Sequence, residues 1–153
     1  MSLLVVVIGV LAWGGTQAQA ATVDSTLSIP VSGTVTAADG TRITFSGNVV
    51  VSSSAVMDVA GIPPFTMLTF DCSGVTATSG SGANKKTYDT RGYQVTKIRE
   101  IVATDVITMT APLDQTGASP LLASTWQVTA TLNFNTATGQ LTSGTLAATA
   151  AAQ

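Results

Sequence analysis

Apolar and polar residues alternate one by one along most of the chain that follows residue 20. In the two clearest runs every second residue is apolar or glycine, from Leu27 to Val35 and again from Ile43 to Val51. This period of two is typical of β-strands with one buried face, whereas a helix would repeat its apolar residues every three or four positions. The pattern therefore predicts two strands joined by a tight turn at Ala38-Asp39-Gly40.

The turn determines how these two strands face each other. If Gly40 takes the left-handed position of a three-residue loop with a G1 bulge, Val35 lies opposite Ile43. A two-residue loop would shift the pairing by one residue and place Phe45 opposite Thr34. Because only the first choice brings the two apolar faces together, we predict the three-residue loop.

A second hairpin is predicted near the end of the chain. Apolar and polar residues alternate from Trp126 to Phe134, and the segment 135–139 has the composition of a turn. Residues 140–147 then form the second strand of the hairpin, running back along the first. We interpret Trp126 as a core anchor, because amphipathic aromatic side chains are usually packed; stacking on a ligand is its alternative role. The Ala-rich end, 147–152, either extends the last strand or frays.

The middle of the chain is less regular. Pro63 and Pro64 should lie outside any hydrogen-bonded ladder, because proline has no N–H to donate. We predict a strand at 65–72, a flexible loop at 79–84, a long strand at 87–102 bent near Gly92, a strand at 106–110 and a surface connection at 111–122. About seven to nine short strands with frequent turns predict an all-β domain, a single antiparallel β-sandwich or small barrel.

The first 20 residues differ from the rest and predict a hydrophobic leader. Residues 3–13 are apolar without interruption, and Ala18-Gln19-Ala20 has the small-x-small pattern of a signal-peptidase site. The run is too short for an ordinary membrane helix. We therefore predict a signal peptide at 1–20 and an all-β domain at 21–153. Since no Lys or Arg precedes the apolar run, a retained leader, acting as a short anchor or as a packing helix in a filament, is the alternative.

Composition narrows the range of partners. The net charge is −2 and only 9% of the 153 residues are charged, so the chain lacks the basic surface that nucleic-acid binding requires. Cys72 is the single cysteine, which rules out an internal disulfide. We interpret it as a small buried residue, with an intermolecular disulfide as the alternative. There is no Asn-x-Ser/Thr triplet, which favours a bacterial setting.

Histidine is missing from the chain, and this excludes most catalytic and zinc-binding arrangements. We predict no cofactor and no metal site. Eight carboxylates remain, and a glycosidase could draw a pair of them from distant strands. We interpret them instead as solvated groups of turns and strand ends: Asp24, Asp39, Asp58, Asp71, Asp89, Glu100, Asp105 and Asp114.

Five of the six basic residues gather in one short part of the chain. This concentration suggests an edge strand that is protected by charge from pairing with other sheets. The alternative is a strip that recognises a partner subunit or an anionic surface. The basic residues are Lys85, Lys86, Arg91, Lys97 and Arg99, and the aromatic residues that could contact a ligand are Tyr88, Tyr93 and Trp126.

The order glycine, apolar residue, Phe, Gly, Val at 40–51 resembles the first strand of chaperone–usher fimbrial subunits. Those subunits usually place a cysteine shortly afterwards, where this chain has Ser52-Ser53-Ser54, and they tend to end in a strand with an aromatic residue, where this chain has 148–153. We read the likeness as a general feature of exported β-proteins and assign no family.

The sequence leads to one preferred function and two alternatives. Export, low charge and the lack of catalytic groups favour a non-enzymatic structural or adhesive component of a bacterial envelope or extracellular assembly, such as a filament or surface subunit. It would be secreted, periplasmic or on the cell surface, and would associate with itself or with another envelope protein. The first alternative is a soluble periplasmic binding module for a small apolar or glycan ligand, and the second is a secreted hydrolase that uses two carboxylates.

Overall fold

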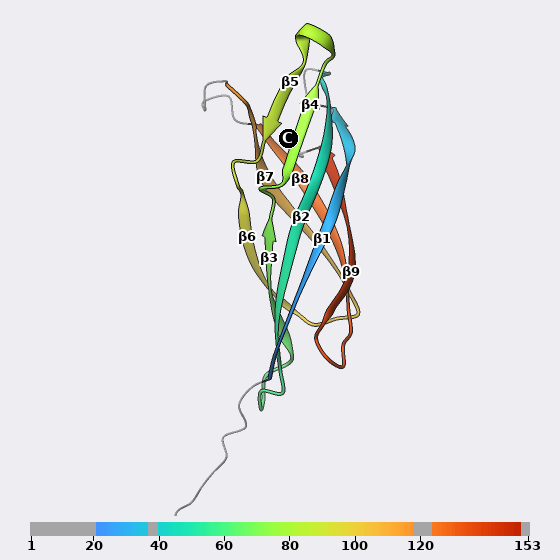
Figure 1. Ribbon diagram of the computed structural model, residues 1–153. Helices are drawn as coiled ribbons and strands as arrows, with labels where there is room; N and C mark the ends of the chain where they lie inside the picture. The colour runs from blue at the N-terminus through green and yellow to red at the C-terminus, as the bar shows by residue number, and fades with distance from the viewer. Residues whose placement is uncertain (1–20, 37–39, 118–123, 151–153) are drawn as a thin grey trace, which may run out of the picture.

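The computed structural model describes residues 21–36, 40–117 and 124–150, and over these residues the chain is all-β (Figure 1). The predicted leader at 1–20 lies outside the described residues. The one helical element among them is a 3-10 turn, η1 (Gly82–Asn84). The strands are β1 (Ala21–Thr36), β2 (Arg42–Met57), β3 (Phe65–Asp71), β4 (Val75–Ser79), β5 (Lys86–Asp89), β6 (Gln94–Glu100), β7 (Thr104–Gln115), β8 (Ser124–Phe134) and β9 (Leu141–Ala150).

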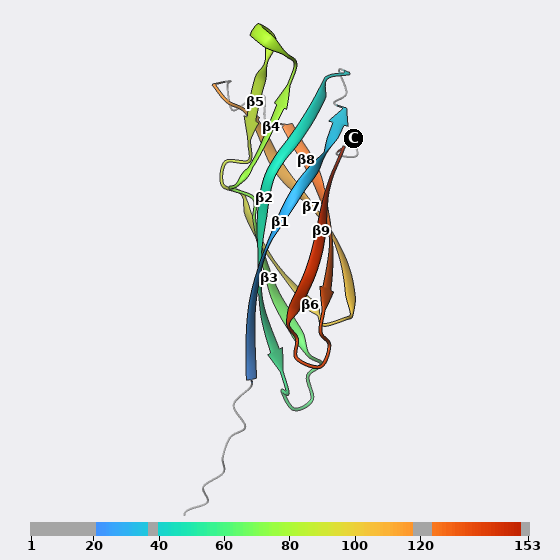
Figure 2. The ribbon, with the colours of Figure 1, turned by 45° about the vertical axis from the view of Figure 1, so that its right-hand side comes forward.

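The nine strands form one mixed sheet in the order β1-β9-β8-β7-β5-β4-β2-β3-β6, and β1 also pairs with β2 (Figures 1 and 2). The prediction of a purely antiparallel sheet is wrong at one contact, because β1 and β9 are parallel over Val31–Leu146 and Ser32–Ala147. The hairpin with β2 occupies one side of β1. Its other side meets β9, whose direction is set by the hairpin with β8.

The predicted register of the first hairpin is confirmed. Val35 lies opposite Ile43 and Gly33 opposite Phe45, and Gly40 has the left-handed φ of 82° that the predicted loop requires. The second hairpin, β8 with β9, is confirmed as well, and β9 extends through the alanine-rich segment as far as Ala150.

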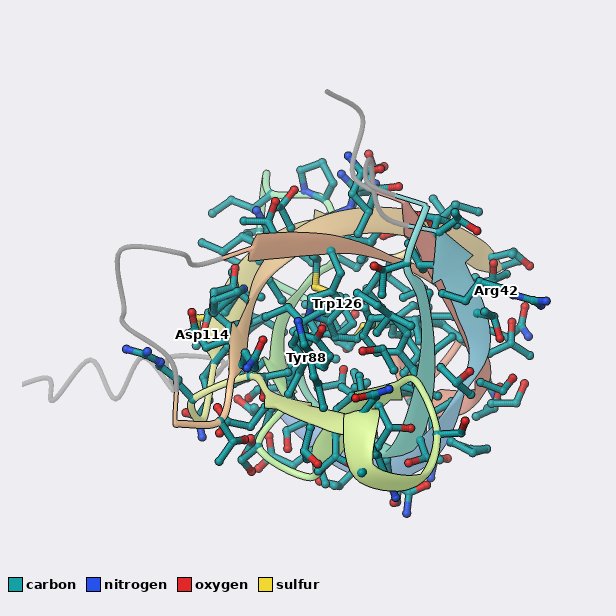
Figure 3. The ribbon with its side chains drawn as sticks, turned by 90° about the horizontal axis from the view of Figure 1, so that it is seen from above. Arg42, Tyr88, Asp114 and Trp126 are labelled. Atoms are coloured by element: carbon teal, nitrogen blue, oxygen red, sulfur yellow. The ribbon has the colours of Figure 1, made fainter. Side chains whose placement is uncertain are left out.

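The side chains that the alternation predicts to face inward form the core. Ile43 and Phe45 from the first hairpin are buried together with Val128 and Leu132 from the second. Figure 3, which looks along the molecule, shows the strands arranged around an interior filled by side chains, among them Trp126. One shared core therefore holds together strands that lie far apart in the sequence.

Strand β2 changes partner part-way along its length. Its first half, Ile43–Gly47, pairs with β4, and its second half, Val50–Val56, pairs with β3. At the change the backbone of Gly74, in the β3–β4 connection, lies directly against Gly47, whose φ is 116°. A Cβ atom at position 47 would overlap the carbonyl oxygen of Gly74, so the crossing requires glycine there.

The long strand predicted at 87–102 is wrong, because this segment forms the two strands β5 and β6. Arg91 and Gly92 both have positive φ, of 50° and 66°, and this pair turns the chain between the two strands. As a result β5 pairs with β4 and β7, while β6 pairs with β3. A single bent strand could not reach both sets of partners.

The surface connection predicted at 111–122 is wrong in its first part, since β7 continues to Gln115. Pro112 is compatible with the strand because its nitrogen faces away from β8. Phe134 N–H donates a hydrogen bond to Ala103 O, so residues 103 and 134 form a hydrogen-bonded pair, and every second residue of β7 from there on bonds to β8. Position 112 falls between these bonded residues, so the ladder loses no hydrogen bond at the proline. Strand β4 was not predicted, although its alternating Val75, Ala77 and Ser79 are buried. Within the described ranges no helix is both long and apolar enough for a membrane span.

Candidate interaction surface at the β6 edge

Strand β6 forms an edge of the sheet. Of the described strands it pairs only with β3, over its whole seven-residue length. All its residues are exposed except Val95, which is half-buried and packs against the core. One side of β6 therefore presents main-chain donors and acceptors that no described strand occupies.

Three exposed apolar side chains and the half-buried Phe65 gather beside this edge, and we call Ile62, Phe65, Met67 and Ile98 the β6 patch. Met67 and Ile98 are direct partners in the β3–β6 ladder and are 48% and 69% exposed. Phe65 lies two residues before Met67 on the same face of β3, and Ile62 is 51% exposed in the turn before it. Apolar side chains that cluster on a surface mark sites of interaction more often than isolated ones do.

The patch borders a shallow groove of about 280 Å³. Its apolar wall consists of Ile62, Pro63, Pro64, Phe65 and Ile98, and its polar rim consists of Arg99 and Glu100. A groove of this shape suits a side chain or an extended segment of another protein better than an enclosed small molecule.

The five basic residues predicted as a strip lie in three places. Lys85 and Lys86 are at the end of the molecule where the β4–β5 connection turns, Arg91 is in the β5–β6 turn, and Lys97 and Arg99 are on β6 (Figure 1). Lys97 and Arg99 share one face of β6, opposite the buried Leu68 and Thr66.

Both arginines reach across to carboxylates of β7. Arg91 forms an ion pair with the buried Asp114. Arg99 donates two hydrogen bonds to the buried Asp105, from Nε to Oδ2 at 2.7 Å and from Nη2 to Oδ1 at 2.6 Å. The bonds from Arg99 lower the pKa of Asp105, and Asp105 raises the pKa of Arg99. Both ion pairs therefore act within the domain: the Arg99 pair connects β6 to β7, the Arg91 pair connects the β5–β6 turn to β7, and the charges are balanced there.

Replacing Arg99 with glutamine should destabilise the domain at neutral pH by about 1 kcal/mol, a modest value because the arginine is about half exposed. The lowered pKa of Asp105 means that its contribution is complete above the unfolded-state value of about 3.9 and is lost as the pH falls through the folded-state pKa. The difference in unfolding free energy between wild type and Arg99→Gln should therefore shrink below about pH 4.

Urea denaturation followed over a series of pH values measures this effect, with Lys97→Gln as the control. Lys97 lies on the same face of the same strand and forms no ion pair with the described residues. A deficit in Arg99→Gln that persists undiminished at acid pH would contradict the proposed role of the pair.

The aromatic residues predicted as ligand contacts lie mainly inside. Trp126 is buried and stacks on Phe45, with ring centroids 4.4 Å apart, and the buried Tyr88 shares a hydrogen bond of 3.1 Å with the hydroxyl of Ser79 (Figure 3). Tyr93 is half-buried against the core. The prediction of Trp126 as a core anchor is confirmed, and the groove beside β6 contains none of the three aromatic residues.

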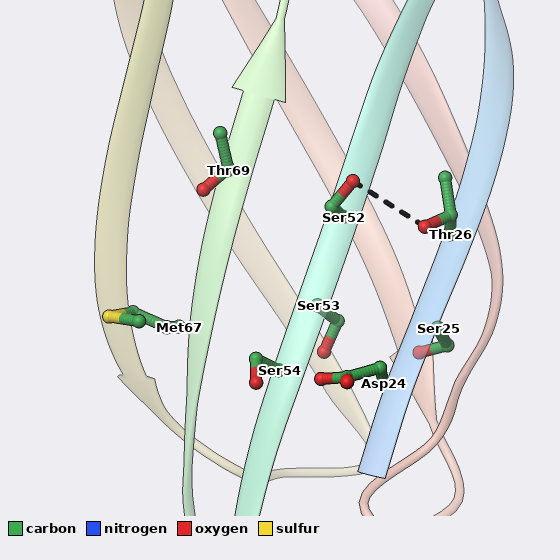
Figure 4. A pocket seen from close by; sticks show the side chains of 8 residues that line it. All are labelled: Asp24, Ser25, Thr26, Ser52, Ser53, Ser54, Met67 and Thr69. Carbon is green, nitrogen blue, oxygen red and sulfur yellow. Dashed lines mark hydrogen bonds between the residues drawn. The ribbon is translucent and has the colours of Figure 1, made fainter. Parts of the chain in front are cut away.

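The outer face of β1, β2 and β3 is covered mainly by hydroxyl groups. A shallow cavity of about 160 Å³ lies over these strands, and Figure 4 shows Ser52 with its hydroxyl toward Thr26, which donates to it at 3.4 Å. The cavity is lined by Asp24, Ser25, Thr26, Ser52, Ser53, Ser54, Met67 and Thr69. Ser52 is also the ladder partner of Thr69, and Thr69 that of Thr96, so one row of hydroxyls runs across the sheet to the β6 edge.

Cys72 lies in the core and is unsuited to reaction at neutral pH. Burial, and secondarily the charge of Asp71, raises the pKa of its thiol to about 11, so the reactive thiolate is rare. Its side chain is 1% exposed, and its carbonyl accepts a hydrogen bond from Thr90 Oγ1 at 2.7 Å. This placement supports the structural interpretation, because a disulfide to a second chain would require the core to open.

The carboxylates of the described residues are mostly engaged in local contacts. Asp105 and Asp114 are paired with arginines, and Asp71 accepts hydrogen bonds from the N–H of Ser73 and from the Gln94 side chain, with Ser73 as the main cause of its lowered pKa. The described part of the chain contains no cluster of three or more side chains able to hold a metal ion.

Comparison with known proteins identifies no relative: the chain matches no family of proteins, no curated protein and no solved structure. Its interpretation therefore rests on the surface itself.

Proposed function

We propose that this chain is a non-enzymatic structural or adhesive subunit of an exported bacterial assembly, in the envelope or outside the cell. The observation that carries the proposal is the β6 edge, a strand bonded on one side and bordered by the exposed β6 patch. An open edge offers main-chain hydrogen bonds to another strand, and the patch gains free energy when a partner covers it.

In this role the nine-stranded sheet is the small sandwich or barrel expected from the sequence, and it holds the β6 edge in a fixed position. Low charge and hydroxyl-covered outer faces support association, because neighbouring subunits repel each other little. The positive charges of Arg99 on β6 and of Arg91 in the turn before it are balanced by Asp105 and Asp114.

The alternative functions have less support. A module that holds a glycan or apolar ligand would need an aromatic platform, whereas Trp126 and Tyr88 contribute to the core. A hydrolase would need two carboxylates free to face a cleft, whereas the buried Asp105 and Asp114 are each held by an arginine.

Expression of the full chain in a bacterium tests the proposal. Mass spectrometry of the recovered protein reports whether residues 1–20 are removed during export, and sedimentation velocity over a wide range of concentrations reports association. We expect exported protein whose mean mass rises with concentration, or that sediments with the envelope fraction. Protein that stays in the cytoplasm, or is exported but remains a monomer free of the envelope, would refute the proposal.

A further inference from the structure

The hydrogen bonds beside the β3–β6 ladder show which backbone groups of β6 remain available. Ile101 N–H donates to Pro64 O, and Cys72 N–H donates to Tyr93 O, at the two ends of the ladder. In an antiparallel ladder the bonded residues alternate, so Val95, Lys97 and Arg99 direct their backbone groups to β3. The residues that direct their N–H and C=O away from β3 are Gln94, Thr96, Ile98 and Glu100.

This free edge lacks two of the features that usually prevent pairing, a proline and a β-bulge. Strand β6 contains no proline, and its ladder with β3 runs without a bulge from Phe65–Glu100 to Asp71–Gln94. Its charged residues are Lys97, Arg99 and Glu100, but Arg99 is engaged by Asp105. Lys97 is therefore the main charge that an incoming strand would meet on the inner face.

We propose that β6 pairs antiparallel with β6 of a second copy of this chain, about a two-fold axis at Ile98. The inference rests on the proposed function and specifies the contact that the assembly uses. Ile98 would then lie opposite its own copy, and the row Met67–Ile98 would continue into Ile98 and Met67 of the second copy. The most exposed apolar side chain of the edge becomes covered by an identical one.

Three registers overlap most of β6, and side-chain contacts distinguish them. An axis at Lys97 places two uncompensated ammonium groups opposite each other, which is unfavourable. An axis at Thr96 leaves Ile98 against Gln94 and the patch largely uncovered. The axis at Ile98 places Lys97 opposite Arg99 of the second copy. That Arg99 is paired with Asp105, so Lys97 faces an ion pair with no net charge. Burial of the isoleucines outweighs the weak remaining opposition between exposed charges.

A two-fold contact of this kind pairs the copies and then closes, because each β6 edge is used once. The dimer would carry one continuous sheet across the axis, with the outer hydroxyl row of Thr69 and Thr96 on both sides. A longer assembly would add a second contact to this dimer.

The test compares full chains that differ at one exposed apolar position. Ile98→Lys places two ammonium groups on the axis, and Val106→Lys makes the same change on the outer face of β7, where the side chain is 58% exposed. By sedimentation equilibrium the dimer dissociation constant should rise roughly a hundredfold in Ile98→Lys and stay unchanged in Val106→Lys. Circular dichroism should show that both variants fold, since neither position is buried.

A second measurement reads the register directly. The shortest bismaleimide should cross-link two copies of Ile98→Cys but not two copies of Gln94→Cys, because the two residues at position 94 lie far apart when the axis is at Ile98. Cys72 is present in every variant but is buried, so it should not react with the reagent. Equal association of wild type and Ile98→Lys, or cross-linking at 94 in place of 98, would overturn this inference and leave the proposed function standing. A wild-type chain that shows no association and no envelope binding would overturn both.

Discussion

Gly47→Ala is expected to destabilise the domain by about 3 kcal/mol or more, the sum of an overpacked contact and a strained backbone. The new Cβ would overlap the carbonyl oxygen of Gly74, and backbone atoms cannot move aside as a flexible side chain can. The φ of 116° at position 47 adds strain for any residue with a side chain. Because β2 changes from β4 to β3 at this point, the lost contact would weaken both ladders.

Urea denaturation of Gly47→Ala beside Gly61→Ala separates the two causes. Gly61 also has a positive φ, of 78°, but a Cβ there would meet nothing within 4 Å. Gly61→Ala should therefore cost only about 1 kcal/mol, the strain of the left-handed conformation alone. If the two variants lose equal stability, the close approach of Gly47 and Gly74 does not determine the fold.

The two terminal hairpins could be predicted from the sequence because local signals agree there. In β1 and β2 the turn glycine and the apolar alternation specify the same register, and a shift of one residue would expose Phe45. In β8 and β9 the alternation is long and one-sided, which leaves a single way to bury Trp126 and Leu132. Agreement between turn chemistry and pattern is what makes such predictions specific.

The middle of the chain could not be predicted because its strands are short and change partners. The break between β5 and β6 needs a positive φ at Arg91, of 50°, as well as at Gly92, and the sequence marked only the glycine, which indicated a bend and not a break between two strands. Pro112 indicated a loop, but its nitrogen faces away from β8, and the described pairs on the other side of β7 begin only at Asp114, so the proline interrupts neither ladder. Both features depend on the arrangement of the sheet, which local pattern does not contain.

The candidate surface was predicted only in part. The basic residues indicated an edge strand, and β6 is an edge, but the apolar patch beside it was missed. A signal was present: Met67 is out of phase with Leu68 and Phe70, which set the buried face of β3. Ile98 is likewise out of phase with Val95. An apolar residue on the polar face of a strand is a sign of a surface that another molecule covers.

Trp126→Ala is expected to cost about 3–5 kcal/mol of unfolding free energy, the largest loss from a single core side chain here. The indole is 1% exposed and stacks on Phe45 at an angle of 21° between the rings, so its removal leaves a cavity and ends the stacking. Urea denaturation followed by far-UV circular dichroism measures the loss without relying on the fluorescence of the residue that is replaced.

Trp126→Phe should cost far less, about 1–2 kcal/mol, because two effects oppose each other. The smaller ring loses some buried surface but can still stack on Phe45. At the same time it removes Nε1–H, which is buried and has no hydrogen-bond partner among the described residues. An unsatisfied buried donor costs free energy, and its removal should return part of the lost stability. If Trp126→Phe is as unstable as Trp126→Ala, the indole N–H has a partner in solution, and Trp126 contributes through that hydrogen bond as well as through packing.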